Sequence, residues 1–219
     1  MGKDKLRRFA EIDTFSNVLQ LDAGKELKGQ WASNQFKNNN PVVLELACGK
    51  GEYSVSLAQM FPDKNFIGVD YKGNRIWRGA KTALEEGVNN VAFLRIQIES
   101  ILEYFAPEEV DEIWITFPDP QPQVGREKKR LTSPRFLDMY KHIVKQGGFI
   151  NLKKDNDDLH AYTAEKIGEL ELILHAKTED LYHSEFDNEV LSIKTYYEKK
   201  YLKDNKNINY LKFSFTNPS

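Results

Sequence analysis

Between residues 42 and 70, two carboxylates and two glycines occur at a spacing that is typical of a ligand-binding turn. The run Val42–Ser54 reads VVLELACGKGEYS, an apolar stretch with one carboxylate, Glu45, followed by Gly49 and Gly51. Two glycines allow a tight turn close to a ligand, and the N–H groups that open the next helix face that ligand. A second apolar run ends in Asp70, 19 residues after Gly51. At this spacing an acid at a strand tip accepts hydrogen bonds from ribose hydroxyls.

Two classes of cofactor use such a unit, and Glu45 separates them. In a dinucleotide site a third glycine completes G-x-G-x-x-G beneath the pyrophosphate, and Ser54 occupies that position here. A carboxylate at the strand end is a poor neighbour for pyrophosphate but suits a cationic ligand. The pattern therefore favours S-adenosylmethionine, which carries a sulfonium and an ammonium. The alternative is a doubly wound domain with a glycine turn and no cofactor.

Two further acids follow later apolar runs. Asp119 stands in FPDPQP (117–122), where three prolines restrict the backbone. We expect Asp119 to be held beside the transferred group, the alternative being a rigid connection without a role in the site. Asp155 follows the run at 149–152 and is either a site residue or the N-cap of the next helix.

The elements that must position these residues alternate between apolar runs and amphipathic segments. This order predicts an α/β, Rossmann-like fold with a central, mostly parallel, seven-stranded sheet, helices on both faces and an antiparallel C-terminal hairpin. Residues 1–40 are expected to form a basic and aromatic N-terminal extension, and residues 41–216 a single domain. The predicted strands span 42–46, 65–70, 91–96, 110–117, 149–152, 170–175 and 208–215.

Composition narrows the class of protein. The chain has 219 residues, a net charge of −2 and one cysteine, Cys48, which we interpret as a packing residue in the turn. No apolar run of 18 residues and no signal segment is present, so we expect a cytoplasmic protein without a membrane span. The basic residues cluster at 3–8 and at 126–135, and such patches meet phosphate even when the net charge is negative. A solvated tail or loop is the alternative for each cluster.

Six motifs, in this order, resemble the bacterial tRNA (guanine-N7-)-methyltransferase family over roughly residues 40 to 215. They are Glu45–Glu52, Ile67–Asp70, Phe117–Pro120, Lys128–Thr132, Lys153–Asn156 and Thr195–Glu198. The resemblance implies a class I methyltransferase fold and methyl transfer from S-adenosylmethionine to guanine N7 in tRNA, at guanosine 46 of the variable loop, with S-adenosylhomocysteine as product.

The resemblance also implies roles for individual residues. The implied cofactor-binding residues are Glu45, Gly49, Gly51, Asp70, Gln97 and Asp119, and Asp119 is also the catalytic candidate. The implied substrate-binding residues are Gln123, Asp155, Thr195, Glu198, Arg126, Lys128, Lys129 and Arg130. Gln97 replaces an acid that is frequent in the family, and its amide oxygen can still accept from the adenine amino group. Gln121 and Gln123 stand where the family often has Trp and Lys, which affects the tRNA contact.

The implied reaction needs few functional groups. Guanine N7 already carries an in-plane lone pair, so the reaction requires in-line approach and electrostatic positioning rather than a general base or a metal. We expect no metal site, tRNA as partner, and a monomer or homodimer. Other readings remain: another RNA or amino-group methyltransferase, an RNA-binding module with an idle cofactor site, and a capping box formed by Thr195 and Glu198.

Overall fold

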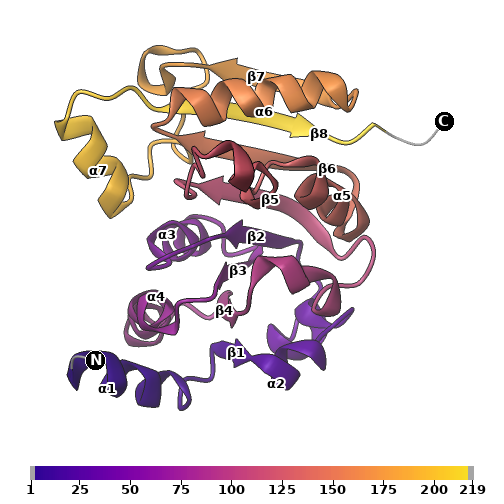
Figure 1. Ribbon diagram of the computed structural model, residues 1–219. Coiled ribbons are helices and arrows are strands. Elements are labelled where there is room, and N and C mark those ends of the chain that lie inside the picture. Colours follow the sequence, from indigo (N-terminus) through magenta and orange to yellow (C-terminus); the bar gives the residue numbers. More distant parts are fainter. Residues whose placement is uncertain (1–2, 217–219) are drawn as a thin grey trace.

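An eight-stranded sheet organises the computed structural model, which describes residues 3–216 (Figure 1). Residues 1–2 of the expected N-terminal extension lie outside this range. The strand order is β1-β4-β3-β2-β5-β6-β8-β7, and only β8 runs antiparallel to its neighbours. The strands are β1 (Val18–Gln20), β2 (Val42–Leu46), β3 (Asn65–Asp70), β4 (Val91–Arg95), β5 (Val110–Thr116), β6 (Val144–Lys154), β7 (Ile173–Thr178) and β8 (Asn209–Ser214).

The predicted fold class is confirmed, but the predicted count of seven strands is wrong. The additional strand, β1, lies within residues 1–40 and pairs in parallel with β4, Val18 opposite Phe93. Three residues are too few to show a period of two in the sequence, and the pairing depends on β4, more than 70 positions away. The expected extension therefore supplies the edge strand of the sheet.

Helices cover both faces of the sheet, as Figure 1 shows. One face packs against α1 (Lys3–Ile12), α3 (Glu52–Met60) and α4 (Gly73–Glu86). The other packs against α5 (Pro134–Ile143) and α6 (Asp157–Glu169), the short helix α2 (Leu21–Lys25), and the turns η1 (Trp31–Gln35) and η2 (Ile98–Glu103). The remaining elements are η3 (Val124–Lys129), η4 (Leu181–His183) and α7 (Tyr196–Lys203).

Side chains from the first 40 residues enter both cores. Ile12 and Trp31 are fully buried, the first under α4 and the second stacked on Phe105. Trp77 of α4 donates its indole N–H to Glu11 at 2.6 Å. Within the described part of the chain, no helix combines the length and apolarity needed to cross a membrane.

The parallel strands place the loops that carry the predicted site at one edge. The arrows of β2 and β5 point to the side on which α7 lies (Figure 1). The turn after β2, the tip of β3, the loop after β5 and the end of β6 therefore meet there, as ligand-binding loops do in open α/β sheets.

Candidate functional site

The backbone of the glycine turn between β2 and α3 packs directly against the backbone of α4 at Gly79. Gly49 and Gly51 have φ of +57° and +70°, the left-handed region that glycine adopts without strain. A Cβ at Gly51 would collide with the ring of Phe93 in β4. A Cβ at Gly79 of α4 would lie 2.5 Å from the Lys50 carbonyl oxygen, and one at Gly68 of β3 would lie 2.8 Å from Phe93 Cδ1. The turn thus rests on α4 and on one aromatic ring.

Glu45 lies at the end of β2 with its carboxylate buried. Oε2 accepts from the Ser54 backbone N–H at 2.9 Å and from the Ser54 hydroxyl at 2.5 Å, and Oε1 accepts from the Thr116 hydroxyl at 2.6 Å. Burial is the main cause that raises the pKa of Glu45 to about 7, against the lowering effect of these hydrogen bonds. The carboxylate joins β2, α3 and β5 beside the turn.

Asp70 closes the turn from the tip of β3. Its Oδ2 accepts from Gly49 N–H at 3.0 Å, and its Oδ1 accepts from Lys72 N–H at 2.8 Å. A carboxylate offers about four lone-pair sites, so Asp70 retains acceptor capacity for the hydroxyls of a ligand. The turn, Glu45 and Asp70 thus form a cradle with the properties that a cationic nucleoside requires.

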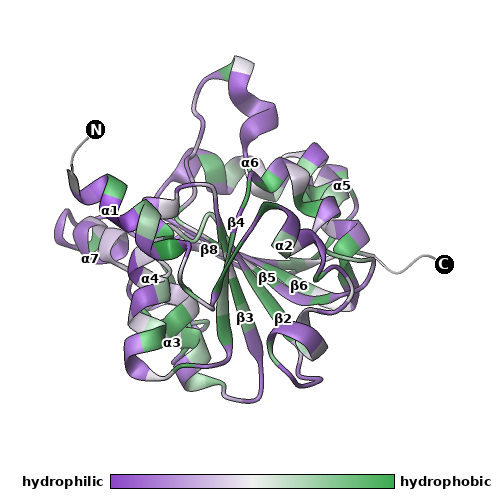
Figure 2. Cartoon of the chain, turned by 90° about the horizontal axis from the view of Figure 1, so that it is seen from below, coloured by the Kyte–Doolittle hydropathy of each residue, from purple (hydrophilic) through white to green (hydrophobic). Residues whose placement is uncertain are grey.

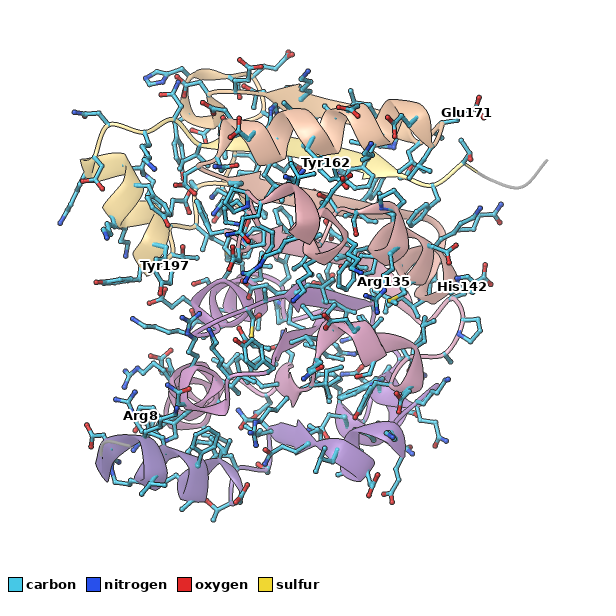
Figure 3. The ribbon with its side chains drawn as sticks, viewed as in Figure 1. Arg8, Arg135, His142, Tyr162, Glu171 and Tyr197 are labelled. Carbon is cyan, nitrogen blue, oxygen red and sulfur yellow. The ribbon has the colours of Figure 1, made fainter. Side chains whose placement is uncertain are left out.

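A cavity of about 60 Å³ lies at this cradle. Its lining joins the turn to β5, α4 and the start of α7 through Glu45, Gly49, Arg75, Thr116, Thr195 and Tyr197. Figure 3 shows Tyr197 at the end of α7 nearest α3. Cys48 also lines the cavity, and burial raises the pKa of its thiol. The structure thereby brings Thr195 to the same cavity as Glu45, 150 positions earlier in the sequence.

Two other predicted cofactor residues are exposed. Asp119 lies in the loop after β5, where Phe117 and Gln121 both have positive φ, and its Oδ1 accepts from Gln121 N–H at 3.1 Å. Gln97 precedes η2 and is exposed, and its backbone carbonyl accepts from the Ser100 hydroxyl. Neither residue lines the cavity at the glycine turn.

Asp155 is an ion-paired residue at the end of β6. Its carboxylate lies 3.1 Å from Lys154 Nζ and 3.3 Å from Lys206 Nζ, with 6% of the side chain exposed. The N-cap of α6 is Asn156, whose side chain accepts from Leu159 N–H at 2.8 Å. The alternative of an N-cap role for Asp155 is therefore wrong.

Thr195 and Glu198 begin α7. The Thr195 hydroxyl oxygen accepts from Glu198 N–H at 3.3 Å, the hydrogen bond of an N-cap. The Glu198 carboxylate is fully buried, lies 2.8 Å from Lys153 Nζ and accepts from the Tyr182 hydroxyl at 2.5 Å. Lys153 and Tyr182 were not among the predicted residues. The available signal was a lysine directly after the predicted strand at 149–152, since a lysine that continues a buried strand is almost never fully buried unless it is paired.

The basic segment divides into exposed and packed side chains. Arg126, Lys128 and Lys129 of η3 are exposed. Arg130 instead places its guanidinium over the ring of Tyr162 at 4.3 Å and donates Nε–H to the Gln121 carbonyl at 3.3 Å. Figure 2 shows the segment as the projection above α6, and Figure 3 places Tyr162 on α6. The predicted residue Gln123 is the exposed N-cap residue of this turn.

Comparisons with known proteins agree with this geometry. A family model described as "Putative methyltransferase" matches residues 39–211. The chain is 54% identical to a tRNA (guanine-N(7)-)-methyltransferase of Christiangramia forsetii, over 97% of this chain and 98% of that protein. It is 47% identical to the enzyme of the same name from Bacteroides thetaiotaomicron, over 97% and 86%.

A solved structure, the 16S rRNA methyltransferase KamB, is similar with a TM-score of 0.62 at 16% identity, over 91% of this chain and 95% of that one. At that identity the likeness concerns the fold alone.

Proposed function

The chain belongs to the tRNA (guanine-N(7)-)-methyltransferase family, and we propose that it methylates N7 of a guanine in tRNA, with S-adenosylmethionine as donor. The observation that carries the proposal is the identity of 54% along almost the whole of both chains. The cradle supports it, because Glu45 and Gly49 line one cavity and Asp70 accepts from the Gly49 N–H beside it. Guanosine 46 of the variable loop is the proposed acceptor.

The cradle residues have separate tasks in this proposal. Asp70 accepts hydrogen bonds from the ribose hydroxyls, and Gly49 and Gly51 let the backbone approach the donor. Glu45 supplies negative charge at the strand end. Outside the cradle, at the start of η2, Gln97 accepts from the adenine amino group. The group bound there supplies an electrophilic methyl on a sulfonium. Because the N7 lone pair is the nucleophile, the protein contributes orientation and charge rather than proton transfer.

The acceptor side is built by three segments around the same edge. Asp119 lies on the proline-restricted loop after β5, where it positions the reacting groups. Asp155 at the end of β6 and Thr195 at the start of α7 bind the guanosine. Glu198, whose carboxylate is buried against Lys153, acts through Thr195, because its N–H donates to the Thr195 hydroxyl oxygen. Phe117 packs on Tyr201 of α7 with ring centroids 5.9 Å apart, which fixes the loop and α7 relative to one another.

The tRNA backbone meets the basic segment in this proposal. Arg126, Lys128 and Lys129 are exposed next to the Asp119 loop and bind phosphates, while Gln123 contributes a neutral hydrogen-bonding contact. Arg130 shapes the segment through Tyr162. The enzyme acts in the cytoplasm as a monomer or homodimer.

A labelling experiment tests the proposal. The protein is incubated with methyl-labelled S-adenosylmethionine and unmodified tRNA, and the labelled nucleoside is identified after digestion. We expect 7-methylguanosine, and its absence from a tRNA in which guanosine 46 is replaced by adenosine. Label in 6-methyladenosine would favour an amino-group methyltransferase. Binding of tRNA without any transfer would favour an RNA-binding module with an idle cofactor site.

A further inference from the structure

The surface of α7 that faces away from the core carries only basic and aromatic side chains. Within Tyr196–Lys203 the sequence is YYEKKYLK, and its single acid, Glu198, is buried against Lys153. Tyr196, Lys199, Lys200 and Lys203 are spaced i, i+3, i+4 and i+7, which places them on one helix face. All four are exposed, Tyr196 by 55%. We call these four residues the α7 stripe.

The opposite face of α7 fixes the stripe in position. Glu198 is paired with Lys153, and Tyr201 packs on Phe117. At the start of the helix, Tyr196 N–H donates to the Glu52 carboxylate of α3 at 2.7 Å. The helix is therefore anchored to α3, to β6 and to the Asp119 loop, and it holds its exposed side chains in a defined place.

The stripe borders the candidate site. Thr195 and Tyr197, on either side of Tyr196, line the cavity at the glycine turn. Lys50 of that turn places Nζ over the Tyr196 ring at 4.1 Å, which adds a fourth cation to the three lysines. Among the described residues, Lys199, Lys200 and Lys203 form no ion pair. Glu52 accepts from Tyr196 N–H, and Asp204 is the C-cap residue of the helix.

This combination of charges and rings matches single-stranded or looped RNA. Phosphates are bound by lysines, and an exposed tyrosine provides a face on which an unstacked base can stack. A guanosine that reaches the cavity must leave its neighbours, so the nucleotides flanking it pass over whatever surface borders the cavity.

We propose that the α7 stripe is a second RNA-binding surface, distinct from the basic segment at 126–129, which binds the backbone and one base of the nucleotides next to the methylated guanosine. The proposal rests on the proposed function. It assigns RNA contact to Tyr196, Lys199, Lys200 and Lys203, for which the family resemblance implied no role. The two surfaces together then define the path of the RNA past the site.

A triple variant tests the stripe. Lys199→Gln, Lys200→Gln and Lys203→Gln together remove three positive charges and keep residues with good helix propensity. The matched control replaces Lys37, Lys141 and Lys145 with Gln. Lys37 and Lys141 precede β2 and β6, and Lys145, which is paired with Asp111, is the second residue of β6, so all three lie toward the amino ends of these strands. The Kd for unmodified tRNA is measured at several salt concentrations, together with the Kd for S-adenosylmethionine.

We expect the stripe variant to bind tRNA about tenfold or more weakly at low salt and to flatten the log–log salt slope by about 2 to 3, since each phosphate contact contributes about 0.7 to 0.9. Its affinity for S-adenosylmethionine stays that of the wild type, which shows that the cofactor site is intact, and its far-UV circular dichroism stays that of the wild type, which shows that helix content is kept. The control variant keeps most of the slope. Equal slopes and equal Kd values for the stripe variant and the control would overturn the proposal.

Substitutions of Tyr196 separate stacking from charge. Tyr196→Phe keeps the ring and is expected to bind tRNA like the wild type, whereas Tyr196→Ala loses about tenfold in affinity without a change in slope. Equal affinities for the two variants would remove the stacked base from the proposal. If the wild-type protein methylates tRNA and the stripe variant is unaffected, only the stripe is refuted. If the wild-type protein neither binds nor methylates tRNA, both proposals fail.

Discussion

Lys153 and Glu198 form an ion pair from which solvent is excluded: Nζ and Oε1 are 2.8 Å apart, and both side chains have no exposed surface. The pair joins the end of β6 to the first turn of α7. The same ammonium donates to the carbonyl oxygens of Leu191 and, at 3.0 Å, Ile193. One buried charge therefore fastens the segment that leads to Thr195. Burial lowers the pKa of Lys153, against the raising effect of Glu198.

Removing one partner of this pair should be costly. Lys153→Met leaves Glu198 buried without its counter-charge, and breaking such a pair costs about 3–5 kcal/mol of unfolding free energy. The double variant Lys153→Met/Glu198→Leu should recover a large part of this loss, because no charge stays buried. Urea denaturation measures both. Lys25→Met, which breaks the exposed pair with Glu103 at 2.6 Å, is the control and should change little. A double variant less stable than Lys153→Met would contradict the prediction.

Glu45 should make the stability of the free protein depend on pH. Its pKa is about 7 in the folded protein and about 4.5 in an exposed chain, so the folded state binds more protons between these values. The stabilisation is complete below about pH 4.5 and is lost as pH rises to about 7, with a total of about 3 kcal/mol.

Glu45→Gln removes this proton-linked difference. The amide oxygen can still accept from Ser54, and the Thr116 hydroxyl can accept from the new amide group. Denaturation at several pH values should give a flatter profile for Glu45→Gln than for the wild type between pH 4.5 and 7. Parallel profiles would show that folding leaves the pKa of Glu45 unchanged.

Asp70→Ala should weaken the binding of S-adenosylmethionine. Each ribose hydrogen bond to this carboxylate is worth about 1.5–3 kcal/mol, and the substitution also frees the N–H groups of Gly49 and Lys72. We expect Kd to rise by about tenfold to a hundredfold or more in calorimetry. Asp63→Ala, in the exposed turn before β3, is the control. Unchanged affinity would place the ribose elsewhere.

The basic segment should separate tRNA affinity from cofactor affinity. Replacing Arg126, Lys128 and Lys129 with alanine should flatten the salt slope of tRNA binding by up to about 0.9 for each duplex phosphate that is no longer bound, or about 0.7 on a single strand. Cofactor affinity should barely change.

Arg130→Ala provides the comparison for this segment. It removes the interactions with the Tyr162 ring and with the Gln121 carbonyl, so its effect should appear mainly in stability. Wild-type slope and affinity in the triple variant would remove the segment from the RNA interface.

The sequence predicts the central strands well because each has its own local signal. The observed bounds of β2 and β3 are the predicted ones, since both are short apolar runs with a clear end. The glycine turn follows β2, and Asp70 ends β3. β1 has no such signal: its three residues acquire a strand conformation only by pairing with β4. β6 is longer than the predicted strand at 149–152. It begins at Val144, directly after α5, and ends at Lys154.

The candidate site was predictable where a site residue lies at the end of an apolar run or in the turn directly after it. Glu45, Gly49, Gly51 and Asp70 lie together at the turn, as their spacing indicated. Lys153 and Tyr182 were missed because their roles depend on the return of α7 to β6. No local pattern encodes a contact of this sequence separation. The cofactor and substrate roles of the predicted residues stay proposals.

The glycines that surround Phe93 have consequences for how this sequence can evolve. Gly51 and Gly79 are limited by backbone as well as by Phe93. The positive φ of Gly51 would strain a side chain there, and the Lys50 carbonyl oxygen blocks a Cβ at Gly79, so a smaller residue at 93 would not by itself relieve either position. Gly68 is different, because its neighbours are the side chains of Phe93 and Cys48. Alanine at position 68 becomes tolerable when residue 93 is smaller. Across homologues, the residues at positions 68 and 93 should therefore covary. Positions 51 and 79 should remain glycine whichever residue stands at 93.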